Sequence, residues 1–175
     1  EACSEWLSII LQSDCNITDE TVFVFSDEKS WNLFFTARHS MPDLALKKTK
    51  ELDGISIITD TIVPPKNFDT FLKKTHKAIL KSNIEYLLFG HLGDCHLHFH
   101  LIYKKEQSDQ VIKIYNNIVD LSSNLGGVYS AEHGTGKRKR IDFIKCYGAS
   151  AAQQIKKTKL FFDPDLLVNK GNIIS

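Results

Sequence analysis

Four of the chain's seven histidines fall in one stretch, Gly-His-Leu-Gly-Asp-Cys-His-Leu-His-Phe-His, which runs from Gly90 to His100. From His96 onward, histidine alternates with an apolar residue, and this period of two is typical of a β-strand. The imidazoles of residues 96, 98 and 100 are therefore predicted to share one face. His91 precedes a Gly-Asp turn and reaches the same face if the chain folds back. Imidazoles gathered on one face suit a transition-metal ion or proton transfer.

A second unusual stretch, Ser-Ala-Glu-His-Gly-Thr-Gly-Lys-Arg-Lys-Arg, occupies residues 130–140. Glu132 and His133 are adjacent and directly follow a short predicted strand. The stretch does not fit a phosphate-binding loop, because Ala131 and Arg138 stand where Gly and Ser or Thr are needed. Residues 137–140 are interpreted as a solvated basic turn rather than a nucleic-acid patch.

Two histidines and one carboxylate form a common open metal site, with positions left for substrate or water. His91, His98 and Glu132 supply such a set if the loop at 132 meets the histidine-rich hairpin. The spacing alone does not show that they meet.

The composition describes an ordinary globular chain, with 42% hydrophobic and 25% charged residues and a net charge of +1. This near-neutral balance predicts no attraction to nucleic acid or to an anionic membrane. No apolar run is long enough to span a bilayer, and no N-terminal stretch resembles a signal peptide. The four cysteines are scattered, so a reducing cytoplasm is expected. Because the chain begins at Glu1 and has its only methionine at position 41, it is expected to be a piece of a longer protein.

Helical and strand patterns alternate along the chain and predict one α+β domain over residues 1–175. Its sheet is expected to be mostly antiparallel, with helices packed on one face. Strands are predicted at 21–25, 55–63, 86–89, 96–103 and 128–130. Helices are predicted at 1–12, from a cap at Ser26 or Asp27 to Pro42, from a cap at Asn67 to 79, from 108 to a stop at 126–127, and at 149–161.

With both clusters in view, the chain resembles the C-terminal, substrate-side domain of the FAD-linked oxidases, which include D-lactate dehydrogenase, D-2-hydroxyglutarate dehydrogenase and the glycolate oxidase flavin subunit. The matching stretches, in order, are Gly90-His91-Leu92-Gly93-Asp94, His98, Gly126 to Gly136 and Phe162-Asp163-Pro164. Trp31 and Arg38 resemble an earlier Trp-x-x-Arg region, and Asp60 to Pro64 resembles the family's Asp-x-x-x-Pro strand end.

The resemblance implies a ferredoxin-like domain that packs against an FAD-binding domain, which has no counterpart in this chain. It implies a divalent metal, typically zinc, held by His91, His98 and Glu132. It also implies that His133 is the catalytic base. Arg38 and His100 are expected to bind a 2-hydroxy acid, and Cys95 and His96 are expected to lie at the flavin.

Departures from the family pattern concern the turn and the strand. The family usually reads Gly-Asp-Gly-Asn-x-His, whereas Cys95 and His96 replace the Gly and the Asn here, and His100 stands where many members have Asn. A lysine that helps bind dicarboxylates in some members is Ile58 here, which weakens a 2-hydroxyglutarate assignment.

Two other functions are kept open. His96, His98 and His100 also resemble the His-x-His-x-His motif of histidine-triad nucleotide hydrolases and transferases, in which an imidazole attacks phosphate. That interpretation leaves Glu132 and His133 unexplained. The third is a non-catalytic fragment that binds metal. Under the favoured interpretation the parent protein is an FAD-dependent enzyme, and this fragment alone is expected to be inactive. The parent is expected in the cytoplasm or peripheral at the inner face of the membrane. A homodimer is allowed.

Overall fold

A computed structural model describes residues 2–13 and 17–174 of the chain. By their contacts the residues form two compact units, 1–43 and 44–175. The expectation of a single domain stays a prediction.

The first unit contains helix α1 (Ala2–Leu11), a 3₁₀ turn at Asp19–Thr21 and the start of helix α2 (Glu28–Glu51). Asp27 caps α2 as predicted, since its Oδ1 accepts the N–H of Ser30 at 2.9 Å. The prediction that Pro42 ends or interrupts this helix was wrong, because α2 continues past it to Glu51. Buried Ala45 and Thr49 hold the later turns of α2 within the second unit.

The strand predicted at 21–25 does not form. A strand needs a neighbour to accept its backbone hydrogen bonds, and the sheet of this protein belongs to the second unit. Phe25 instead packs its ring on Trp31 and Phe34 of α2, with centroids 6.3 and 5.2 Å away. The aromatic residues that suggested a strand are therefore used in a side-chain cluster.

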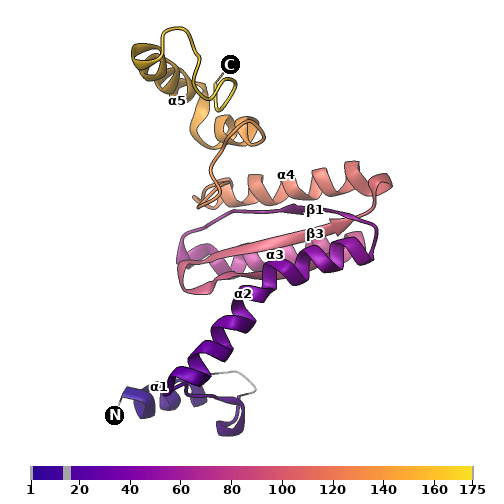
Figure 1. Ribbon diagram of the computed structural model, residues 1–175, viewed down its shortest axis with the longest axis vertical. Helices are drawn as coiled ribbons and strands as arrows, with labels where there is room; N and C mark the ends of the chain where they lie inside the picture. Colours follow the sequence, from indigo (N-terminus) through magenta and orange to yellow (C-terminus); the bar gives the residue numbers. More distant parts are fainter. Residues whose placement is uncertain (1, 14–16, 175) are drawn as a thin grey trace. The chain divides into compact units, whose positions relative to one another are not determined.

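The second unit is built on a three-stranded antiparallel sheet of β1 (Ile55–Ile58), β2 (Glu85–His91) and β3 (His96–Tyr103), in the order β1-β3-β2. Helix α3 (Pro65–Ser82) follows β1, the 3₁₀ turn η2 (Leu92–Asp94) joins β2 to β3, and a turn at Lys105–Gln107 leads into helix α4 (Ser108–Asn124). After α4, Val128 and Ser130 form isolated bridges with Ile62 and Asp60. The α+β prediction is confirmed, and the order of elements is that of a ferredoxin-like unit whose last strand is reduced to these bridges (Figure 1).

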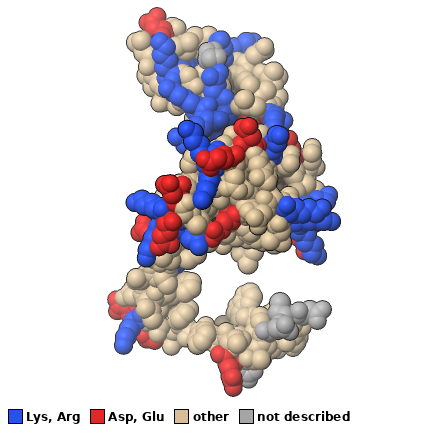
Figure 2. Space-filling view, turned by 90° about the vertical axis from the view of Figure 1, so that its right-hand side faces the viewer, with Lys and Arg blue, Asp and Glu red and all other residues tan. Residues whose placement is uncertain are grey.

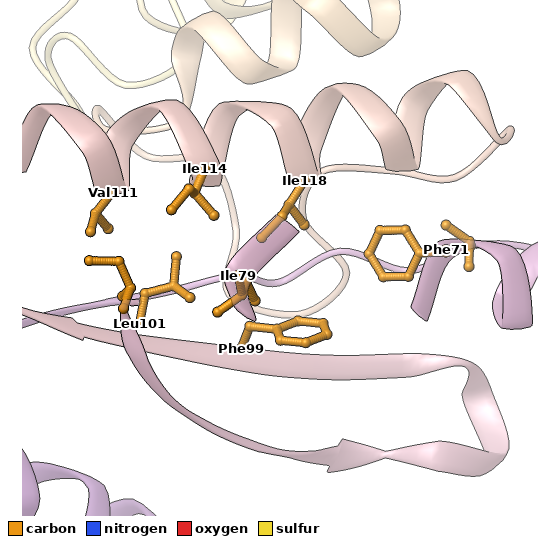
Figure 3. Close-up of a cluster of buried hydrophobic side chains, with 9 residues drawn as sticks. Phe71, Ile79, Phe99, Leu101, Val111, Ile114 and Ile118 are labelled. Carbon is orange, nitrogen blue, oxygen red and sulfur yellow. The ribbon is translucent and has the colours of Figure 1, made fainter. Parts of the chain in front are cut away.

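Helices α3 and α4 cover one face of this sheet. Figure 3 shows Phe99 and Leu101 pointing from β3 toward α4, with Ile79 of α3 beside them. The buried residues of this cluster are Val63, Phe71, Ile79, Ile84, Phe99, Leu101, Val111, Ile114 and Ile118. Because side chains alternate along a strand, positions 98 and 100 of β3, next to these core residues, must face the opposite side of the sheet, and both are histidines.

Helix α5 (Arg140–Phe162) packs on the other side of α4 through a second cluster of Tyr115, Val119, Tyr129 and Phe143. Its backbone leaves the helical conformation at Gly148. The segment after this break matches the helix predicted at 149–161, whereas the segment before it was not predicted. Among the described residues, no helix is both long and apolar enough to cross a membrane, and the cellular location stays a prediction.

Charges of both signs lie on the surface, in keeping with the net charge of +1. Figure 2 shows acidic and basic side chains next to one another over the middle of the face that it presents.

Asn67 does not cap α3 as predicted, because Pro64 and Pro65 already set the start of that helix. Its Nδ2 instead donates to the carbonyl of Leu125 at 2.8 Å, at the end of α4. The side chain therefore ties the start of one helix to the end of the other.

Replacing Asn67 by Ala is expected to lower the free energy of unfolding by about 1 kcal/mol, the usual value of one such hydrogen bond. Urea unfolding followed by circular dichroism measures the change. Asn117→Ala, at an exposed position of α4, is the matched control and should not destabilise the protein. Equal effects of the two variants would contradict the assignment.

Candidate metal centre

The turn between β2 and β3 brings His91 back beside the histidines of β3. In the register of the two strands, His91 lies directly opposite His96, and Phe89 opposite His98. The rings of His91 and His96 are stacked, with centroids 5.6 Å apart. Gly90 permits the approach, because its φ is +150° and a Cβ there would lie 2.7 Å from the carbonyl oxygen of His96. The prediction that His91 reaches the histidine face is confirmed.

Asp60 lies just beyond β1 and is fully buried. Its Oδ2 accepts hydrogen bonds from Ser130 Oγ at 2.6 Å, Lys139 Nζ at 3.0 Å and the N–H of His133 at 3.0 Å. Its Oδ1 is contacted by the N–H of Glu132 at 3.3 Å and by His96 Nε2 at 3.1 Å. Burial acts to raise the pKa of Asp60, but these hydrogen bonds and the charge of Lys139 outweigh it and hold the pKa far below its ordinary value.

These bonds place the Glu132–His133 loop over the histidine face. The parallel bridge of Asp60 with Ser130, and the bond from the N–H of Ala131 to the carbonyl of Asp60 at 2.8 Å, bring the loop to the end of β1. The buried carboxylate then orders the next two residues through their N–H groups. The loop that carries Glu132 therefore meets the histidine-rich hairpin, which the spacing in the sequence alone could not show.

His98 and Glu132 form the closest pair of the cluster, with Nε2 and Oε1 2.9 Å apart. The other ring nitrogen of His98, Nδ1, lies 3.0 Å from the carbonyl oxygen of Thr59. A carbonyl only accepts, so Nδ1 carries a hydrogen. In the neutral ring Nε2 then presents a lone pair to a carboxylate. This contact needs a shared cation, which is either a proton or a metal ion.

His91 completes the predicted ligand set, with Nε2 3.6 Å from Oε2 of Glu132. One nitrogen from each of His91, His96 and His98 and one oxygen of Glu132 all lie within 4.8 Å of one another. Donors bound at about 2.0–2.2 Å to one ion lie within about 4.4 Å of one another, close to this limit. The residues therefore fit a divalent ion of the zinc type. Burial and the nearby His98 lower the pKa of His96, which favours the neutral, ligand-competent ring.

His133 lies beside the pair rather than within the predicted ligand set. Its ring stacks on His98, with centroids 4.8 Å apart and planes at 7°. Its Nε2 is 3.5 Å from Oε1 of Glu132, and its Nδ1 is 3.8 Å from Oδ1 of Asp60. The side chain is 40% exposed, whereas that of His98 is only 6% exposed. Of the two stacked rings, that of His133 is therefore the one that a substrate can reach from solvent.

Three other predicted site residues lie outside this cluster. His100 stacks on Phe89, with centroids 4.8 Å apart, and is half-buried at the next position along β3. Cys95 is buried at the corner after η2, in a left-handed conformation with φ of +55°. Arg38 belongs to the first unit, on α2. Their proposed roles stay predictions.

Asp60, Lys139 and Thr59 were not predicted as site residues, although the first two order the loop and the third orients His98. The sequence signal for Asp60 is a carboxylate at the end of a β-branched strand, in Ile-Ile-Thr-Asp-Thr-Ile-Val. A charge in such a run is buried only when it is paired. Lys139 lies in a basic stretch, and nothing in the sequence distinguishes its role from that of the neighbouring basic residues.

Fold and cluster together define an α+β domain that carries a histidine–carboxylate site on the face of its sheet opposite the core formed with α3 and α4. The family model of the FAD linked oxidases, C-terminal domain, matches residues 7–173. The chain therefore belongs to this family.

Curated relatives include D-lactate dehydrogenase of Archaeoglobus fulgidus, 26% identical over 117 residues, which are 67% of this chain and 26% of the relative. The mitochondrial D-lactate dehydrogenase [cytochrome] 1 of Saccharomyces cerevisiae is 28% identical over 72% of this chain and 22% of its own length. Glycolate oxidase subunit GlcD of Bacillus subtilis is 27% identical over 75% and 28%. The chain thus spans about a quarter of the length of these relatives.

Proposed function

We propose that this chain is the substrate- and metal-binding part of an FAD-dependent enzyme that oxidises a 2-hydroxy acid of the D-lactate or glycolate type. The observation that carries the proposal is the convergence of His91, His98 and Glu132, two imidazoles from the hairpin and one carboxylate from a loop more than thirty positions further on. The names of the relatives support the substrate class.

A divalent metal would lower the pKa of the substrate's α-hydroxyl, and zinc matches a donor set of two imidazoles and a carboxylate. His91, His98 and Glu132 would hold it. The Thr59 carbonyl keeps Nε2 of His98 directed at that position by holding the hydrogen on Nδ1.

His133 is proposed to take the hydroxyl proton. It is half-exposed, it stacks on His98, and its backbone N–H is held by Asp60 at 3.0 Å. This combination fixes the ring's place while leaving an edge open to substrate. Bound FAD, from the FAD-binding domain of the parent protein, would accept the hydride from Cα.

Arg38 and His100 are proposed to bind the substrate. A guanidinium pairs with a carboxylate through two parallel hydrogen bonds, which suits Arg38 for a hydroxy acid. Burial and the nearby His98 and His133 lower the pKa of His100, so its ring is a neutral hydrogen-bonding group rather than a cation. Cys95 and His96 are proposed to lie near the flavin.

The metal content of the purified chain tests the proposal. We expect about one divalent ion per chain in the wild type and almost none in His98→Ala, because the variant removes the most buried of the three proposed ligands. Elemental analysis after dialysis against a trace of Zn²⁺ measures both. His76→Ala, at a histidine that bonds Tyr86 instead, is the control and should keep its metal. An equal metal content per chain in the wild type and in His98→Ala would contradict the proposed site.

A histidine-triad hydrolase is the less favoured function. It would use His96, His98 and His100, but the ring of His100 is stacked on Phe89 and lies outside the group of His91, His96, His98 and Glu132. It also assigns no role to Glu132, which contacts His98 at 2.9 Å.

A further inference from the structure

We propose that His96 is a fourth protein ligand of the metal ion, oriented by Asp60. This inference rests on the proposed function, because it concerns the ion that His91, His98 and Glu132 are proposed to hold. The pattern that the chain resembles has Asn at position 96, so a fourth ligand would distinguish this protein from members with that pattern.

The first support is position. His96 stands in the same group as the three proposed ligands, with one donor atom from each of the four residues within 4.8 Å of the others. Its ring centroid is 4.5 Å from that of His98 and 5.6 Å from that of His91. It is therefore flanked by two proposed ligands on the same face of the sheet.

The second support is the hydrogen bond that the ring makes with Asp60. Nε2 of His96 faces Oδ1 of Asp60 at 3.1 Å, and the four other groups within hydrogen-bond distance of this carboxylate are donors. Asp60 is thus an acceptor, and Nε2 of His96 donates to it. The neutral ring then keeps its lone pair on Nδ1, the nitrogen that does not face Asp60.

This arrangement repeats the one at His98 with a different partner. A metal-binding histidine usually donates its second ring N–H to a carboxylate or a backbone carbonyl, which fixes the tautomer and the ring orientation. His98 donates to the carbonyl of Thr59 and His96 to the carboxylate of Asp60, at neighbouring positions beyond β1. Both rings are also almost fully buried, so their orientation is set before any ion arrives.

Four protein ligands would change the character of the site. Three histidines and one carboxylate satisfy a tetrahedral ion without water, whereas three ligands leave one position open. A 2-hydroxy acid would then bind as an added ligand or replace one of the four. We expect the ion to be held more tightly than a three-ligand site would hold it.

Co²⁺ titration of the chain tests this, with visible absorption as a readout that needs no enzyme activity. The wild type should show the intense absorption of four-coordinate Co²⁺. His96→Asn should weaken Co²⁺ binding by at least the 10- to 100-fold typical of losing an orienting partner, and its spectrum should change to the weak absorption of a higher-coordinate ion completed by water. His76→Asn, at a histidine that bonds Tyr86 instead, should leave both the affinity and the spectrum as in the wild type.

Because His96 is buried, X-ray absorption of the Zn²⁺-loaded wild type provides a second measurement that needs no variant. Three imidazoles around the ion support the inference, and two overturn it. Unchanged Co²⁺ affinity and spectrum in His96→Asn, with binding lost in His98→Ala, also overturn it while leaving the proposed function intact. No binding by the wild type overturns both.

Discussion

Replacing Asp60 by Asn is expected to lower the free energy of unfolding by about 3–5 kcal/mol at neutral pH, the range for removing one partner of a buried charge pair. Five groups lie within hydrogen-bond distance of this carboxylate and donate to it, three to Oδ2 and two to Oδ1. An Asn amide has only one oxygen, so its NH₂ group must face donors whichever way it turns. Lys139, whose side chain is only 16% exposed, would also lose its counter-charge.

Urea unfolding of the wild type and Asp60→Asn measures this loss. Asp120→Asn is the matched control, because Asp120 pairs with Lys145 at the surface, where both side chains are more than a third exposed. Such a pair contributes little, and we expect a change within about 0.5 kcal/mol. Similar losses in the two variants would contradict the role of Asp60.

The effect of Asp60 should depend on pH in one direction. Its pKa in the folded protein is lowered, so its contribution to stability is complete above the unfolded pKa of about 4 and is lost as the pH falls toward the folded pKa. The difference between the wild type and Asp60→Asn should therefore be constant near neutral pH and shrink below about pH 4. A difference that grows on acidification would refute this assignment of the charge.

Gly127→Ala is the second substitution with a large expected effect. A Cβ at this position would lie 2.1 Å from the carbonyl oxygen of Ile62, 2.7 Å from Ser122 Oγ and 2.9 Å from Val63 Cγ1. The first of these atoms belongs to the backbone and cannot turn away. We expect a loss of about 3 kcal/mol or more, at the upper end of the cost of overpacking.

The same substitution should also weaken metal binding. Val128 and Ile62 exchange two backbone hydrogen bonds, of 3.0 and 3.2 Å, next to Gly127. Separating them displaces the segment that leads to Glu132, so metal binding should weaken together with stability. Thermal unfolding and metal content are measured side by side. Gly93→Ala is the control, because a Cβ at Gly93 meets no atom within 4 Å. A Gly127→Ala protein as stable as Gly93→Ala would contradict this packing.

Local patterns predicted much of the site, because a strand's period can be read from a few residues. The alternation of His96, His98 and His100 with apolar residues placed β3 correctly. The helix after Asp27 was found from its cap. What could not be predicted is the partner of each group. That Thr59 and Asp60 would meet the rings of His98 and His96 depends on pairing across nearly forty residues of chain.

Errors arose where a local preference competed with packing. Pro42 removes one hydrogen-bond donor from the interior of a helix, yet α2 continues through it, and Ala45 and Thr49 are buried in the turns that follow. Phe23 and Phe25 have strand preferences, but β-preference describes a fit to a neighbouring strand. No neighbour is present for them among the described residues of the first unit.

Strand β3 has a consequence for how this protein can change during evolution. Its alternate residues serve two purposes, since Phe99 and Leu101 build the core while His96 and His98 build the site on the opposite face. Deleting or inserting a single residue in the turn at 92–95 would exchange the two sets, so that the imidazoles would point into the hydrophobic core and the apolar side chains away from it. A single substitution in this hairpin changes one side chain, whereas a change in its length by one residue would misplace the core and the site together.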